Sequence, residues 1–197
     1  MQVKDKFLEK INFLILIFIL CFSHTLNAEN IYEKIFNYND NLKNSSVNFI
    51  QTNVNEIQEG MMFFGDRRIK IVYKKPQKIT IILSEKKGIY INHELKESQF
   101  FATRNSYIKF FFDVFHKKKY LKNIIVKESD HKIDIKEKII MDNILYNVSL
   151  VYENDPIKLR RLEIENDGEK TQMGFFNHSS EKKFEKKFFS MIDPYLN

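Results

Sequence analysis

Apolar and basic side chains alternate over residues 63–91, which read FFGDRRIKIVYKKPQKITIILSEKKGIYI. Successive side chains of a β-strand point to opposite faces of a sheet, so this alternation predicts strands with one buried face. The apolar positions, in steps of two, are Ile69, Ile71 and Tyr73, followed by Ile79, Ile81 and Leu83. We therefore predict a hairpin that turns at Pro76 and presents one apolar face, either to a core or to a binding site.

The rest of the chain shows the same alternation, interrupted in two places by helical spacing. Apolar residues at helical spacing predict amphipathic helices over residues 31–42 and 106–119, the second with Ser106 as its N-cap. Further strands are predicted at 47–54, 57–64, 89–91, 100–101, 124–126, 133–135, 139–141, 146–152, 159–164 and 171–176. About ten strands in a continuous meander predict an α+β fold, in which a single curved antiparallel sheet carries helices on one face. Such a sheet either closes into a barrel or stays open.

The N-terminus has the pattern of a secretory signal peptide. A lysine-rich start is followed by an apolar run at 13–22 and by Asn27-Ala28, a suitable end for a cleaved segment. The apolar run falls short of the roughly 20 residues that a membrane-spanning helix needs. We therefore expect cleavage near Ala28, with residues 1–28 removed and residues 29–197 forming a single exported domain.

Cys21 leaves an alternative open, in which the chain is a lipoprotein acylated on this cysteine. Lipoprotein signals prefer a small residue before the cysteine, whereas Leu20 stands here, and Cys21 lies inside the apolar run. We favour a cysteine of the signal's apolar region. The exported domain then contains no cysteine and needs no disulfide bond.

Charge and motifs argue against several classes of function. The formal net charge of +6 falls to +5 when the signal's three lysines and two acidic residues are removed, and the basic residues are spread along the chain. Because the domain is exported, we expect no nucleic-acid partner. The histidines are far apart, and the five glycines form no phosphate-binding loop. We predict no enzyme activity, no metal and no cofactor.

Phenylalanine is concentrated on the second predicted helix. The chain contains 19 phenylalanines, and three of them stand in a row at 110–112, followed by Phe115. One face of a helix against a core has room for only part of this apolar surface. Two interpretations remain open, a well-packed core helix and an apolar lid over a site.

A series of short motifs follows a recognisable order. In the first half these are Phe49-Ile50-Gln51, Gly60, the strand IKIVYKKP at 69–76, and Ile89-Tyr90-Ile91. In the second half they are Asp155-Pro156, Leu162-Glu163-Ile164, Asp167-Gly168, Thr171, Phe175-Phe176-Asn177, Phe188-Phe189 and Asp193-Pro194. In their order and spacing they resemble the periplasmic outer-membrane lipoprotein carrier family of Gram-negative bacteria, LolA, over essentially all of residues 29–197.

The resemblance implies an incomplete antiparallel barrel whose open, apolar concave face is covered by helices. It implies a periplasmic chaperone, expected to be a monomer, that receives acylated lipoproteins from an ATP-driven inner-membrane release complex and delivers them to an outer-membrane receptor. The implied acyl-chain groove is Phe49, Phe63, Ile69, Ile71, Tyr73, Ile79, Ile81 and Leu83. The implied lid is Ile35, Phe36, Phe111, Phe112 and Phe115.

One departure from the family concerns the residue that holds the lid. The family carries an Arg-Pro pair before the strand that ends in Pro76, and its arginine keeps the lid closed, whereas Gly65 and Asp66 stand here. Arg67, Arg68 and Lys70 are the nearest basic residues and the candidates for this latch. Lysine lacks the planar, multidentate hydrogen bonding of arginine.

Three other functions are weighed against the carrier. The first is the outer-membrane lipoprotein receptor of the same pathway, which would require acylation of Cys21. The second is an envelope lipid-binding sensor with a related sheet. The third is an enzyme whose site is assembled from distant residues, for which the sequence offers no motif.

Overall fold

The computed structural model describes residues 30–197, apart from residues 105–106, 186 and 197. The predicted signal segment 1–28, Cys21 and the predicted N-cap Ser106 lie outside the described residues. The chain divides into units 1–30 and 31–197, and the fold is that of the second unit. In the part of the chain that is described, no helix is long and apolar enough to cross a membrane.

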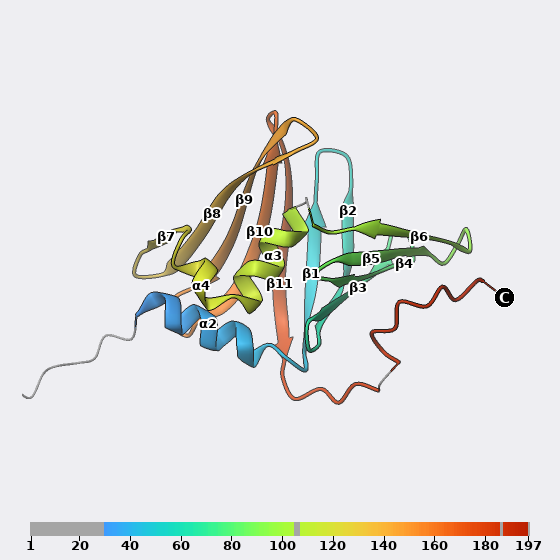
Figure 1. The fold of residues 1–197 in the computed structure, drawn as a ribbon, viewed down its shortest axis with the longest axis horizontal. Helices are drawn as coiled ribbons and strands as arrows, with labels where there is room; N and C mark the ends of the chain where they lie inside the picture. Colours follow the sequence, from blue (N-terminus) through green and yellow to red (C-terminus); the bar gives the residue numbers. More distant parts are fainter. Residues whose placement is uncertain (1–29, 105–106, 186, 197) are drawn as a thin grey trace, which may run out of the picture. The chain divides into compact units, whose positions relative to one another are not determined.

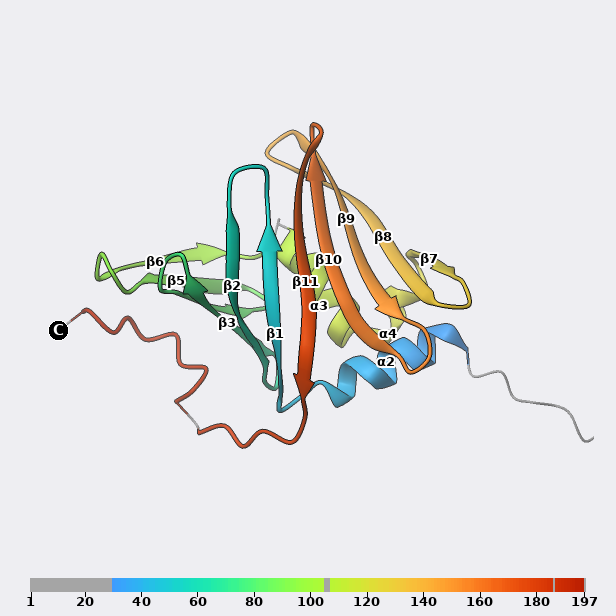
Figure 2. The ribbon, with the colours of Figure 1, turned by 180° about the vertical axis from the view of Figure 1, so that it is seen from behind.

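Eleven antiparallel strands form one sheet in the order β6-β5-β4-β3-β2-β1-β11-β10-β9-β8-β7 (Figure 1). The first half comprises β1 (Ser45–Thr52), β2 (Ile57–Phe64), β3 (Arg68–Lys75), β4 (Ile79–Ser84), β5 (Lys87–Asn92) and β6 (Glu97–Ala102). The second half comprises β7 (Ile125–Glu128), β8 (Lys132–Met141), β9 (Ile144–Glu153), β10 (Lys158–Asn166) and β11 (Glu169–Ser179). Neighbours in the sheet are neighbours in sequence except at β1–β11, where the two halves of the meander join (Figure 2). The edge strands β6 and β7 do not pair, so the sheet is not closed.

The prediction of separate strands at 133–135 and 139–141 is wrong. These residues belong to the single strand β8, which pairs with β9 without a break. Glu137 interrupts the apolar pattern at a position that faces the same side as Ile135, and its carboxylate accepts a hydrogen bond from the Tyr120 hydroxyl. In the sequence, this hydrogen-bonded polar residue has the appearance of a break between two strands.

Among the described residues, three helices accompany the sheet: α2 (Ile31–Asn41), α3 (Tyr107–His116) and α4 (Lys118–Leu121). The chain leaves the sheet at one edge, β6, and re-enters it at the opposite edge, β7, so the connection between them has to pass from edge to edge (Figure 1). Helices α3 and α4 form this connection. The predicted helix over 106–119 is interrupted because Lys117 has an extended backbone conformation.

Stacked aromatic rings and one buried amide hold the helices to the sheet. Phe115 of α3 stacks on Phe64 of β2, with ring centroids 5.6 Å apart. The amide nitrogen of Asn39 in α2 donates to the carbonyl oxygen of Val114 at 3.1 Å, and its amide oxygen accepts from the Tyr152 hydroxyl, also at 3.1 Å. Asn39 is 3% exposed, so both bonds form away from water, where a missing partner would be costly. One side chain thus links α2, α3 and β9.

Gly60 makes room for a contact inside the sheet. Phe49 and Tyr73 lie on the strands either side of β2 and meet edge to face across Gly60, with ring centroids 5.1 Å apart. A Cβ atom on Gly60 would stand 2.5 Å from Cζ of Phe49 and would also collide with the backbone of Val72. The glycine is therefore required by packing.

We expect Gly60→Ala to lower the free energy of unfolding by about 1–3 kcal/mol, because the added methyl group overpacks a site with no free space. Gly174→Ala is the matched control in β11. Its Cβ would find no heavy atom closer than 3.9 Å, and we expect a change within about 0.5 kcal/mol. Urea denaturation measures both, and equal losses in the two variants would contradict this account.

Candidate functional site

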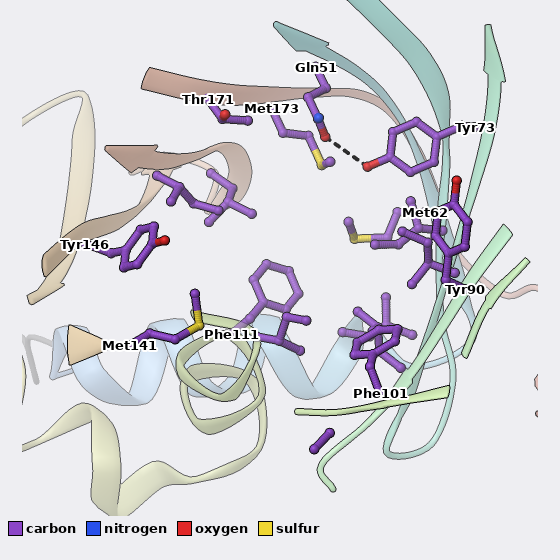
Figure 3. Close-up of a pocket in the computed structure, with 18 of the residues that line it drawn as sticks. Gln51, Met62, Tyr73, Tyr90, Phe101, Phe111, Met141, Tyr146, Thr171 and Met173 are labelled. Carbon is purple, nitrogen blue, oxygen red and sulfur yellow. Dashed lines mark hydrogen bonds between the residues drawn. The ribbon is translucent and has the colours of Figure 1, made fainter. Parts of the chain in front are cut away.

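A cavity of about 720 Å³ lies between one face of the sheet and α3 (Figure 3). We call this the inner face of the sheet and the opposite one the outer face. The lining residues are Gln51, Met62, Ile69, Ile71, Tyr73, Ile81, Leu83, Tyr90, Gln99, Phe101, Ala102, Ile108, Phe111, Met141, Tyr146, Leu162, Ile164, Thr171 and Met173. They come from both halves of the meander and from α3, so the site exists only because distant segments of the chain meet.

The alternating segment at 63–91 supplies one wall of the cavity. Ile71 of β3 stands opposite Met62 of β2 and Ile81 of β4 in the strand register, and all three reach the cavity. Ile69, Tyr73 and Leu83 line it as well. Five of the eight predicted groove residues are thus brought together, and the apolar face of this segment lines a site as well as a core.

The other three predicted groove residues lie elsewhere. Phe49 is fully buried and packs on Tyr73, so it supports the lining without being part of it. Ile79 is buried nearer the start of β4. Phe63 lies on the outer face, where its ring meets those of Phe184 and Phe188 at centroid distances of 6.0 and 5.1 Å. Because Met62 faces inward, the next residue of the strand has to face outward.

The predicted lid residues divide into two groups. Phe111 lines the cavity, together with Ile108, which the sequence analysis did not single out. Phe112 and Phe115 are buried in the core, as is Ile35 of α2, and Phe36 packs against the core. One side of α3 therefore contributes to the cavity and the remainder to the core.

The predicted latch residues Arg68 and Lys70 contact the C-terminal segment that follows β11. Arg68 donates to the carbonyl oxygen of Phe189 at 2.6 Å. Lys70 donates to the carbonyl oxygen of Phe188 at 3.2 Å, and its ammonium lies 4.1 Å from the centre of that ring. Ile69 and Ile71 face the cavity, so Lys70 between them has to face outward and cannot reach a helix on the inner side.

Arg67, the third latch candidate, lies in the turn between β2 and β3 with a φ of +52°. The pKa of His116, at the end of α3, is lowered mainly by burial, and further by the positive charges of Lys43 and then Arg67. Arg67 is therefore near α3, and no hydrogen bond or ion pair to that helix is found for it in the described part of the chain.

An ion-pair network joins α3 to the sheet. The carboxylate of Asp113, which is 3% exposed, contacts Lys109 and lies 2.6 Å from the ammonium of Lys117. Lys117 also lies 2.9 Å from Glu85, in the turn between β4 and β5. These pairs raise the pKa of Lys117. The spacing of four residues between Lys109, Asp113 and Lys117 was the signal in the sequence that could have revealed the first two contacts.

A polar group stands on one side of the cavity. The Tyr73 hydroxyl donates to the amide oxygen of Gln51 at 2.9 Å (Figure 3). The amide nitrogen of Gln51 donates to the amide oxygen of Gln58 at 2.9 Å, and Gln58 donates to the carboxylate of Glu56 at 3.0 Å. Gln51 was quoted within a motif but not recognised as part of a site.

The chemistry of the lining restricts what the cavity can do. None of its described residues is Asp, Glu, Lys, Arg, His or Cys, and nowhere in the described ranges do three or more potential metal ligands gather. The described lining is mostly apolar, and its polar groups are the hydroxyl and amide groups of tyrosine, threonine and glutamine. It can bind an uncharged apolar ligand by removing it from water.

Comparison with known proteins shows a similar fold at very low sequence identity. No family model and no curated protein sequence matches this chain. An uncharacterized conserved protein from Thermus thermophilus is similar in structure, with a TM-score of 0.54 and 7% identity over 83% of this chain and 94% of that one. PNGF-II reaches a TM-score of 0.37 at 7% identity, over 75% of this chain and 29% of that one, which is too low to support an argument. The first likeness shows the fold alone, and the resemblance to lipoprotein carriers continues to rest on the sequence motifs.

We expect Lys70→Met to increase the rate of chymotrypsin cleavage after Phe188 and Phe189. A cation–π contact contributes at least about 0.5–1 kcal/mol, so its loss should open the segment about two- to fivefold more often. Lys74→Met is the matched control, because Lys74 is exposed on the same face of β3 and makes no contact with the C-terminal segment in the described structure. Mass spectrometry of timed digests measures both rates, and equal rates would show that Lys70 does not hold the segment.

Proposed function

We propose that this protein is a periplasmic chaperone that binds the acyl chains of lipoproteins in its cavity and carries them from the inner to the outer membrane. The observation that carries the proposal is the uncharged cavity of about 720 Å³, whose wall includes the segment that resembles lipoprotein carriers. Acyl chains are uncharged and apolar, and they cannot cross an aqueous compartment without being covered.

The proposal includes a finer description of the fold, an incomplete barrel with helices over its concave apolar face. Three features support it. The edges β6 and β7 are unpaired, the connection between them contains α3, and Ile108 and Phe111 of α3 reach the cavity. On this account α3 is the movable cover, and the contacts of Asn39 and Lys117 hold it closed.

A carrier must bind its cargo firmly and still release it. Burial stabilises each methylene group by about 0.8 kcal/mol, so one long acyl chain contributes on the order of 10 kcal/mol. Several chains buried without any opposing cost would approach the practical limit of affinity, about 18–21 kcal/mol, and release would be very slow. A cover that packs its own apolar side chains in the empty cavity opposes binding, because the cargo has to displace them.

The size of the cavity bears on how far the cover moves. At about 30 Å³ for each water-sized group, a cavity of about 720 Å³ has room for on the order of 24 non-hydrogen atoms. One long acyl chain fits this space. A second or third chain requires α3 to move away from the sheet, which breaks the hydrogen bond between Asn39 and Val114 or the ion pair between Lys117 and Glu85.

The partners follow from the same proposal. Cargo comes from an ATP-driven release complex in the inner membrane and passes to an outer-membrane receptor. The carrier itself works as a monomer in the periplasm after cleavage near Ala28. If the chain is the receptor instead, its N-terminus carries an acylated Cys21, which the mass of the purified protein reveals.

A release assay on spheroplasts tests the proposal. Protein expressed from the full 197-residue sequence is purified and added outside spheroplasts that contain a compatible release complex. We expect acylated lipoproteins to appear in the supernatant in one-to-one soluble complexes with the protein. If the supernatant stays free of lipoproteins while a known carrier releases them from the same spheroplasts, the proposal is wrong.

We expect Ile81→Glu to reduce lipoprotein release at least tenfold, because it places a charge in an apolar wall where burial of an unpaired carboxylate is costly. Ile81 is only half-buried, so the variant has water within reach and should still fold, which circular dichroism checks. Val72→Glu is the control, since Val72 is a half-buried residue of the neighbouring strand that faces outward. Equal release by both variants would contradict the assignment of the cavity.

A further inference from the structure

We propose that the polar side of the cavity, formed by Gln51, Tyr73, Tyr90 and Thr171, binds the ester or amide carbonyl groups that join acyl chains to their head group. This inference rests on the proposed function and adds to it a defined subsite and ligand chemistry. It predicts the orientation of the bound ligand, with the acyl chain toward α3 and the carbonyl groups toward the opposite side.

The arrangement of the lining residues supports this orientation. Figure 3 shows Gln51, Tyr73 and Thr171 along one side of the cavity and Phe111 and Phe101 along the other. Phe111 belongs to α3, so these two apolar rings lie on the side of the cavity nearest this helix. An acyl ester has the same division, since a hydrocarbon chain ends at a carbonyl group with two lone pairs.

Hydrogen bonding fixes part of the polar side in place. Tyr73 donates to Gln51 at 2.9 Å, and Gln51 donates to Gln58 at 2.9 Å. The chain of bonds ends at the carboxylate of Glu56, which accepts from Gln58 at 3.0 Å. These bonds determine which way the amide of Gln51 is turned. Its nitrogen carries two N–H groups, and the second is available to a ligand.

Further donors stand on the neighbouring strands. Tyr90 lines the cavity from β5, and Thr171 lines it from β11. Their hydroxyl groups form no hydrogen bond with another residue in the described part of the chain. Carbonyl groups of a bound ligand would satisfy them.

Because the lining carries no charge, we expect it to bind esters and amides in preference to free fatty acids. A carboxylate taken out of water needs a cation or several strong donors, and no lysine, arginine or histidine lines the described cavity. Neutral hydroxyl and amide donors suit neutral carbonyl groups. The ligand chemistry is therefore that of an acyl ester or amide.

The test compares two lipids that differ only in their carbonyl groups, dipalmitoylglycerol and its diether analogue dihexadecylglycerol. Each is included in trace, radiolabelled form in phosphatidylcholine vesicles, and the purified full-chain protein is incubated with them. The label in the soluble protein fraction after the vesicles are removed measures uptake. Palmitic acid serves as a third ligand.

We expect uptake of the diester to exceed that of the diether about tenfold, since each net hydrogen bond changes an equilibrium by a factor of about 2–12, and palmitic acid to bind less than the diester. Tyr90→Phe and Gln51→Leu should bring the ratio of diester to diether uptake toward one. Tyr90→Phe removes a single oxygen atom and should not disturb folding.

The outcomes separate the two proposals. If the wild-type protein takes up both lipids equally, or prefers palmitic acid, the polar subsite is wrong and acyl-chain binding stands. If the wild-type protein takes up none of the three ligands, acyl-chain binding itself fails, and the subsite with it.

Discussion

The pairing of β1 with β11 is the interaction on which the rest of the structure depends. Every other pair of strands joins neighbours in sequence, so each half of the chain could form its own meander. The β1–β11 pairing joins the halves into one sheet and leaves β6 and β7 as its two edges. The segment between those edges then has to cross from one to the other, and this crossing brings α3 to the cavity. A single non-local pairing thus determines where the site is formed.

On the proposed function, the cavity combines an uncharged lining with a movable wall. Its lining offers no charged group, so binding depends on removing apolar surface from water, and its polar side offers directional but neutral hydrogen bonds. The wall formed by α3 is held by the ion pair between Lys117 and Glu85 and by the stacking of Phe115 on Phe64. On this proposal, the cargo has to overcome these contacts before α3 moves away from the sheet.

Sequence periodicity predicted the parts of the structure that depend on local geometry. Alternation located the strands and the inward positions of Ile71 and Ile81, and the apolar spacing located both main helices. The predictions were wrong where a residue was assigned to a face of the sheet without regard to the faces of the residues next to it. Phe63 and Lys70 each stand one position from an inward residue, so the alternation itself places them outside. Contacts such as those of Asn39 with Val114 and Tyr152 join residues 75 and 113 positions apart, and no local pattern could have revealed them.

The most direct test of the account is to locate a bound acyl chain on the protein. A synthetic acylated lipopeptide with a photoreactive diazirine at the end of its acyl chain is bound to the purified protein, irradiated, and mapped by mass spectrometry. The account predicts cross-links to residues that line the cavity, such as Met62, Ile71, Ile81 and Phe111. Cross-links confined to the outer face, at Phe63, Ile82 or Ile91, would contradict it, because the acyl chain would then bind where the C-terminal segment lies.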